Sequence, residues 1–230
     1  MNNYYHTNER KRIEMEVNET YFTHGEVVVH NTPDDLWVSM LGKVLNLTDL
    51  VKEFEATDAV RPIIANAGKD ISHWFDQDTE ELRHHVHPVT GVRVPYLPHG
   101  PIPHVGPEVA TSSWRPVALP WWRDPRYVVG RLTERSRPLR VLNMLINQQC
   151  TVVVCKEDKL SRVLERYLPV NSHAASYTWK SVHGRVLDMD KTLEENGIPD
   201  ERDAFLEIGL KETEYIPLVM LYFNDDLTEL

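Results

Sequence analysis

Prolines set the strongest limit on how this chain can fold. Between residues 93 and 137 they occupy positions 95, 98, 101, 103, 107, 116, 120 and 125. Because proline fixes φ and has no backbone N–H, this stretch cannot form a regular helix or a central strand. Its large aromatic residues are Tyr96, Trp114, Trp121, Trp122 and Tyr127. So many aromatic side chains are costly to leave in water. We therefore interpret residues 93–137 as a connector arm of fixed shape, packed across its own domains or onto a partner.

The arm separates two segments with different hydrophobic patterns. A chain of 230 residues can bury one large core or two small ones. Residues 1–18 are polar and predict an N-terminal tail. We expect residues 19–92 to form a first domain and residues 138–230 to form a second.

The first domain begins with clear helix and hairpin signals. Tyr21 opens a short strand, and Thr23 with Glu26 has the spacing of a helix-capping box. Asp35 to Val38 alternates as a strand, Gly42 marks a turn, and a partner strand follows. Short helices are expected at residues 50–54 and 62–67, with Pro62 in a first turn, and the helical pattern continues over residues 67–75.

The second domain alternates strands with one amphipathic helix. The expected strands are 139–146, 150–155, 176–180, 185–189 and 215–223. Residues 159–168 place their apolar side chains on one helical face, with Asp158 as the cap. Residues 192–197 predict a one-turn helix that ends at Gly197. The last strand is apolar on both faces, so we expect it in the centre of a sheet.

Charge and cysteine content narrow the class of protein. The formal net charge is −10, which disfavours nucleic acid as a partner. No run of eighteen apolar residues is present, so no membrane association is expected. Cys150 and Cys155 are five apart, a spacing that points them to opposite faces of a strand and predicts two reduced thiols. Residues 115–137 hold six arginines, which fits either docking to acidic protein surfaces or a solvated loop.

Catalytic motifs are missing from the sequence. It has no glycine-rich phosphate loop, CxxC pair, HExxH or GxSxG. The paired carboxylates Asp225–Asp226 and Glu194–Glu195 are adjacent residues typical of a solvated surface. We therefore predict a protein that is not an enzyme.

One stretch resembles a haem-binding family. Residues 35–48, Asp-Leu-Trp-Val-Ser-Met-Leu-Gly-Lys-Val-Leu-Asn-Leu-Thr, are similar to the opening hairpin of a cytochrome b5 domain. In that family two histidines hold the haem iron. The resemblance places the first ligand between Phe54 and Ala56, where no side chain can ligate iron. It matches His85 to the second ligand, and His73 is a weaker candidate.

The resemblance extends over nearly the whole chain from Tyr21. The most specific segments are residues 171–180, 192–198 and 221–230. They are similar to a family of ciliary proteins that join a cytochrome b5-like domain to a second domain resembling the ubiquitin-like β-grasp fold. The implied fold class is α+β. The implied location is the axoneme of a motile cilium or flagellum, in association with radial spokes.

Two functions follow as hypotheses. The first is a non-enzymatic assembly protein of the axoneme, without a cofactor, whose interaction residues are Trp114, Trp121, Trp122, Arg123 and Arg126. The second is a redox module with haem on His85, which is a metal ligand only if haem is bound. A zinc or copper site at His84, His85 and His87 is disfavoured, because the run has no neighbouring cysteine or carboxylate pattern.

Overall fold

The computed structural model describes residues 20–106, 115, 117–212 and 214–223. These residues form two compact units that divide between Leu132 and Thr133. The sequence predicted domain boundaries at residues 92 and 138. The observed division differs because the end of the arm forms a strand of the first unit. That strand pairs with the first unit's sheet, so most of the arm belongs to that unit.

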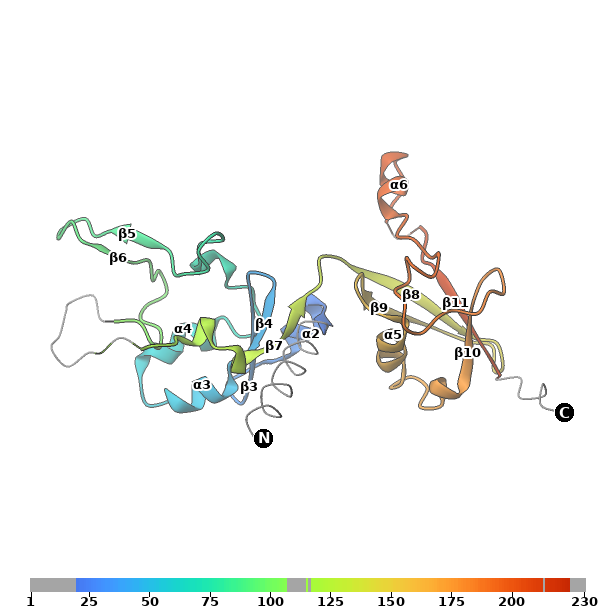
Figure 1. Ribbon diagram of the computed structural model, residues 1–230, viewed down its shortest axis with the longest axis horizontal. Helices are drawn as coiled ribbons and strands as arrows, with labels where there is room; N and C mark the ends of the chain where they lie inside the picture. The colour runs from blue at the N-terminus through green and yellow to red at the C-terminus, as the bar shows by residue number, and fades with distance from the viewer. Residues whose placement is uncertain (1–19, 107–114, 116, 213, 224–230) are drawn as a thin grey trace, which may run out of the picture. The chain divides into compact units, whose positions relative to one another are not determined.

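The first unit is built on a five-stranded sheet (Figure 1). The strand order is β1-β7-β4-β3-β2. Their bounds are β1 Tyr21–Phe22, β2 Asn31–Thr32, β3 Asp35–Met40, β4 Lys43–Asn46 and β7 Val128–Leu132. The predicted hairpin of β3 and β4 is confirmed, with Val38 opposite Leu45.

Short helices cover this sheet. They are α2 His24–Val29, α3 Thr48–Glu53 and α4 Arg61–Ala65, with single 3-10 turns at Asp58–Val60 and Ser72–Trp74. The predicted capping box of α2 is confirmed, because Thr23 Oγ1 accepts from the Glu26 N–H and Glu26 Oε2 accepts from the Thr23 N–H. Pro62 lies in the first turn of α4 as expected.

The prediction that the helix continues over residues 67–75 is wrong. Helix α4 ends at Ala65, and Gly68 has φ +73, a left-handed conformation through which a helix cannot continue. The backbone then runs beside β3, where the Ser39 N–H donates to Lys69 O and the Ile71 N–H donates to Ser39 O. A Cβ at Gly68 would lie 2.9 Å from Val28 O, so this close approach also requires glycine.

A small separate hairpin leaves the first unit after residue 83. It consists of β5 His84–Val86 and β6 Arg93–Pro95, which pair with each other as a two-stranded sheet. Figure 1 shows it extending away from the sheet and helices of its own unit. The arm then returns to the core through 3-10 turns at Trp121–Arg123 and Pro125–Tyr127.

The second unit has a four-stranded sheet in the order β10-β11-β8-β9. The strands are β8 Ser136–Asn143, β9 Gln148–Cys155, β10 Tyr177–Ser181 and β11 Leu218–Phe223. The predicted central position of the last strand is confirmed, because β11 lies between β10 and β8 and runs parallel to β8. Helix α5 Leu160–Tyr167 packs with the core through Leu160, Val163 and Tyr167.

Three smaller expectations for this unit are wrong. Asp158 does not cap α5, since its N-cap is Lys159 without a side-chain hydrogen bond. Residues 185–189 form only an isolated bridge, Lys180 with Val186, beyond a tight turn. Residues 192–197 form turns instead of a helix, because buried Asn196 bonds to the Asp188 and Thr192 carbonyls and Gly197 has φ +77.

A further helix, α6 Arg202–Glu207, lies between these turns and β11 and buries none of its residues. Cys150 and Cys155 are free thiols, as predicted. Within the described part of the chain, no helix has both the length and the apolar character needed to cross a membrane.

Candidate functional site

The first half of the sequence-predicted haem site lies at the end of α3. Phe54 is the residue that ends this helix, and its side chain is partly buried against the core of the first unit. The ring of His104, from the arm, contacts it edge-on at a centroid distance of 5.4 Å. Phe54 is therefore a core residue here, and the arm occupies the space beside it.

The two candidate histidines lie in different surroundings. His73 is in the 3-10 turn Ser72–Trp74, with its ring 6.1 Å from both Trp74 and His99. His85 is exposed on β5 and contacts the ring of Tyr96 at 5.6 Å. The two histidines do not face each other across a shared cavity.

The structure gives no support for a metal site at His84, His85 and His87. Within residues 20–106, 115, 117–212 and 214–223, no three His, Cys, Asp or Glu side chains are grouped to hold a metal ion. His87 Nδ1 instead accepts from the Val89 and Thr90 N–H groups at 3.3 and 3.2 Å, which fixes the hairpin turn.

These residues do not fit a haem held by two histidines. Such a site needs two imidazoles directed at one iron from opposite sides of a flat cavity. Here residues 54–56 supply no ligand, and the arm side chains Ile102 and Trp121 are 3% and 0% exposed in the core next to this region. The core is filled by protein side chains.

Trp121 and Trp122, named above as interaction residues, belong to that core. Trp121 is fully buried, with its ring edge-on to Phe75 at 6.1 Å and to Trp122 at 5.5 Å. Trp122 Nε1 donates to Glu81 Oε2 at 3.2 Å. Of the two alternatives for the arm, the structure shows self-packing at both residues, and a buried indole has no surface to offer a partner. Trp114 lies outside the described residues.

The two arginines of the predicted interaction set are engaged locally. Arg123 Nε lies 2.7 Å from Glu81 Oε1, and Arg126 Nη2 lies 2.6 Å from Asp124 Oδ2. The hydrogen bonds from Arg126 lower the pKa of the nearly buried Asp124. The Arg123–Glu81 pair holds the arm on its own unit and the Arg126–Asp124 pair is local to the arm, although both guanidinium groups remain accessible.

His104 is an important residue that the sequence reasoning missed. Its Nδ1 accepts from the Trp121 N–H at 3.0 Å, so the ring must carry its proton on Nε2. Its backbone has φ +67, which is rare for a residue other than glycine. Burial lowers its pKa, and the neutral form is the one that can accept this bond. In the sequence, the only signal for this role is the position of the histidine directly after Pro103.

A buried ion pair organises the second unit. Asp158 Oδ2 accepts from Arg166 Nε at 2.7 Å and from the Cys155 N–H at 2.9 Å. The Asp158 side chain is 1% exposed, and burial raises its pKa despite the hydrogen bonds. This pair joins the last turn of α5 to the end of β9, so its role is structural.

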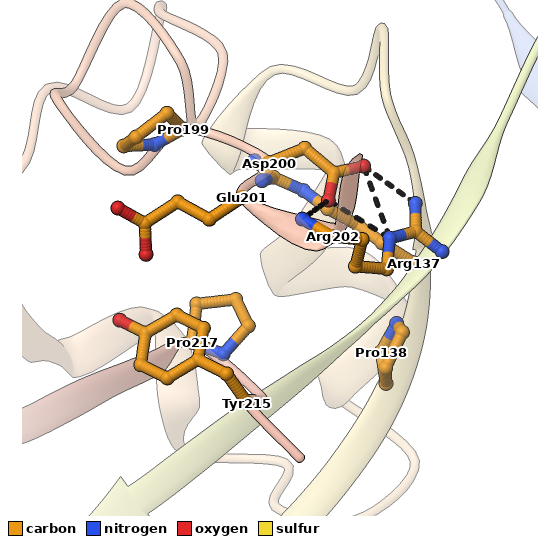
Figure 2. Close-up of a pocket in the computed structure, with 8 residues that line it drawn as sticks. All are labelled: Arg137, Pro138, Pro199, Asp200, Glu201, Arg202, Tyr215 and Pro217. Carbon is orange, nitrogen blue, oxygen red and sulfur yellow. Dashed lines mark hydrogen bonds and ion pairs between the residues drawn. The ribbon is translucent and has the colours of Figure 1, made fainter. Parts of the chain in front are cut away.

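The second unit also has a small pocket beside the start of β8 (Figure 2). Figure 2 shows the Asp200 carboxylate held by Arg202, with Nε to Oδ1 at 2.8 Å, and these hydrogen bonds lower the pKa of Asp200 to about 2. Buried Arg137 donates from Nη2 to Ile198 O at 3.0 Å. The free space is about that of one water molecule, so the pocket is too small for an organic substrate.

Comparison with known proteins identifies the class of the first unit. Cytochrome b5 of Candida tropicalis is 42% identical over 57 residues, which cover 25% of this chain and 43% of that protein. A solved structure of cytochrome b5 of Ostreococcus tauri virus 2 matches 49% of this chain and 95% of that one at 22% identity, with a TM-score of 0.25. No protein-family model matches. The chain is an α+β protein with a cytochrome b5-like N-terminal half.

Longer matches identify the family. Cytochrome b5 domain-containing protein 1 of Homo sapiens is 47% identical over 211 residues, which cover 91% of this chain and 92% of the human protein. The Xenopus laevis protein of the same name is 45% identical over 215 residues, which cover 93% and 99%. The chain belongs to the cytochrome b5 domain-containing protein 1 family.

Proposed function

We propose that this protein is a structural component of the motile ciliary axoneme, associated with radial spokes and contributing to ciliary beating. It acts by binding axonemal proteins, without catalysis, and uses neither nucleic acid nor membrane as a partner. The proposal is supported by the resemblance in sequence to ciliary proteins and by family membership over more than nine tenths of the chain.

The arm packed beside Phe54 is the observation that favours an assembly role over a redox function. A b5-type electron carrier needs its haem cavity open and lined by two ligands. Here the edge contact of Phe54 with His104 and the fully buried Trp121 take up that part of the core. The b5-like unit then serves as a scaffold without haem.

The second unit supports a binding role. Its strand order, the parallel pairing of β8 with β11 and the helix α5 after the first hairpin support a ubiquitin-like β-grasp fold. We infer that it is such a domain. Domains of this kind present one sheet face and their loops to partner proteins, which fits an assembly component.

Localisation in ciliated cells tests the function. Cells depleted of their own copy would express the full chain with a fluorescent tag, and their cilia would be extracted with detergent. We expect the tagged protein to remain with the extracted axoneme and to restore normal beating. A protein released entirely by detergent, with beating unchanged by depletion, would contradict the proposal.

Absorbance spectroscopy tests the proposed absence of haem. Purified full-length protein titrated with haem should develop no stoichiometric Soret band. The alternative, a redox module with haem on His85, predicts a tight 1:1 Soret band that is lost in His85→Ala. The matched variant His84→Ala, one residue earlier on β5, should then keep the band.

A further inference from the structure

The hairpin of residues 83–96 is not part of the hydrophobic core of either unit. It comprises β5, β6 and the turn that joins them, and it extends from its unit in Figure 1. Its paired residues are His84 with Pro95, His85 with Val94 and Val86 with Arg93. The described part of the chain places no third strand against either of its edges.

Charge sets the hairpin apart from the rest of the chain. The chain contains 35 Asp and Glu residues, but none lies between residues 82 and 106. The hairpin instead carries Arg83, Arg93 and three histidines. Of the acidic residues at its base, Glu80 pairs with Lys43 at 2.7 Å and Glu81 with Arg123 at 2.7 Å, while Asp76 lies beside Arg83 and interacts with it electrostatically. Arg83 and Arg93 both remain exposed.

Apolar side chains are exposed on the same hairpin. Val86, Val89 and Val92 are 66%, 86% and 58% exposed, and Tyr96 is 45% exposed. Single exposed apolar residues are ordinary, but here there are four within eleven residues of a projecting element. By the pairing register Val86 shares one face with Arg93, and Tyr96 shares the other face with Arg83, so each face has an arginine beside an exposed apolar side chain. Together with the arginines they suit a partner that is both acidic and partly apolar.

Backbone geometry shows which edge is open. The Tyr96 N–H donates to Arg83 O and the His87 N–H donates to Val92 O, so the residues that flank β5 on either side bond inward across the hairpin, and His85 between them is in the same inward register. By the alternation of an antiparallel ladder, the N–H and C=O groups of His84 and Val86 lie on the outer edge. The other edge is interrupted, because Pro95 has no N–H.

We propose that the outer edge of β5 binds an extended acidic segment of a partner protein, which adds a third strand to the hairpin. This inference rests on the proposed function as an assembly protein and names one of its contact surfaces. Backbone hydrogen bonds to His84 and Val86 supply affinity, while Arg83, Arg93 and the exposed valines select acidic and apolar side chains.

A membrane or nucleic acid fits this surface less well. Anionic bilayers are bound by clusters of about four to eight Lys or Arg residues, and nucleic acids by comparable basic footprints. The hairpin has two arginines. An open strand edge, in contrast, is matched by an extended peptide backbone.

Peptide binding tests the proposal with the full-length protein. The probe is a fluorescein-labelled ten-residue peptide that alternates Glu and Val, measured by fluorescence anisotropy, with an alternating Lys and Val peptide as its control. We expect saturable binding of the acidic peptide only, weakened by salt. Arg93→Glu should weaken it about tenfold, whereas Arg61→Glu, a reversal at another exposed arginine, at the start of α4, should leave it unchanged.

A second pair of variants tests the backbone contact. Val86→Pro removes an outward N–H and keeps the inward bonds of the ladder, so it should abolish binding, while Val86→Thr keeps the N–H and should bind normally. Unchanged melting temperatures would show that each variant is folded. Equal binding by all variants, or binding to phosphatidylserine vesicles but not to the peptide, overturns the proposal. Retention in the axoneme is measured separately, so a failure here leaves the proposed function standing.

Discussion

The two units fill their cores in different ways. In the second unit most of the core side chains come from strands and the amphipathic helix α5, with Leu139, Val141 and Leu160 among the fully buried residues. In the first unit a proline-rich arm supplies Ile102, Trp121 and Trp122 to a core begun by the sheet. Strands and helices satisfy their backbone hydrogen bonds in regular ladders and turns, whereas an irregular arm is held in place by the packing of its side chains.

The largest test of this comparison removes one tryptophan from each unit. Trp121→Ala should destabilise the first unit by about 4 kcal/mol, because a fully buried indole leaves a cavity. Trp179→Ala, 3% exposed in the second unit, is the matched change. Hydrogen exchange followed by mass spectrometry should show lost protection in residues 20–132 for the first variant and in residues 133–223 for the second. Equal loss in both units for either variant would contradict independent cores.

A smaller effect is expected from the buried ion pair of the second unit. Asp158→Asn should destabilise this unit by about 3 kcal/mol, because the charge that balances the 9% exposed Arg166 is removed. Urea unfolding followed by hydrogen exchange in residues 133–223 measures the loss. The double variant Asp158→Asn with Arg166→Met should recover part of it. A double variant less stable than the single one would show that the pair is not the cause.

The smallest effect concerns His104 and the way in which the arm is held. His104→Ala should cost about 1 kcal/mol through the lost hydrogen bond to the Trp121 N–H. His104→Asn retains an acceptor and tolerates the left-handed backbone, so it should cost less. Thermal unfolding of the two variants, followed in the first unit, measures the difference.

The same residue predicts a pH dependence. Burial lowers the folded-state pKa of His104 below 6.5, so the unfolded chain binds more protons just below that pH. Its contribution to stability is therefore fully present above pH 6.5 and falls as the pH drops toward the folded-state value. His104→Asn should remove this part of the pH dependence. An unchanged slope between pH 6.5 and 5 would exclude His104 as its origin.

Elements with strong local signals were predicted correctly. The capping box at Thr23 and Glu26, the hairpin of β3 and β4, helix α5 and the central strand β11 were all recognised from spacing and periodicity. Failures occurred where a tertiary contact overrode a local pattern. The helical pattern of residues 67–75 does not form a continuous helix, because α4 ends at Ala65 and the backbone from Gly68 to Ile71 bonds to β3.

The candidate site shows the same division. The sequence by itself determined that residues 54–56 carry no iron ligand, that Cys150 and Cys155 are too unfavourably spaced to pair, and that the arm cannot be a helix. Only the tertiary structure decided that Trp121 and Trp122 are core residues, that His104 contacts Phe54, and that β5 has an open edge. Residue identity fixes which chemistry is available, but burial and pairing depend on contacts between residues far apart in the chain, which no local pattern encodes.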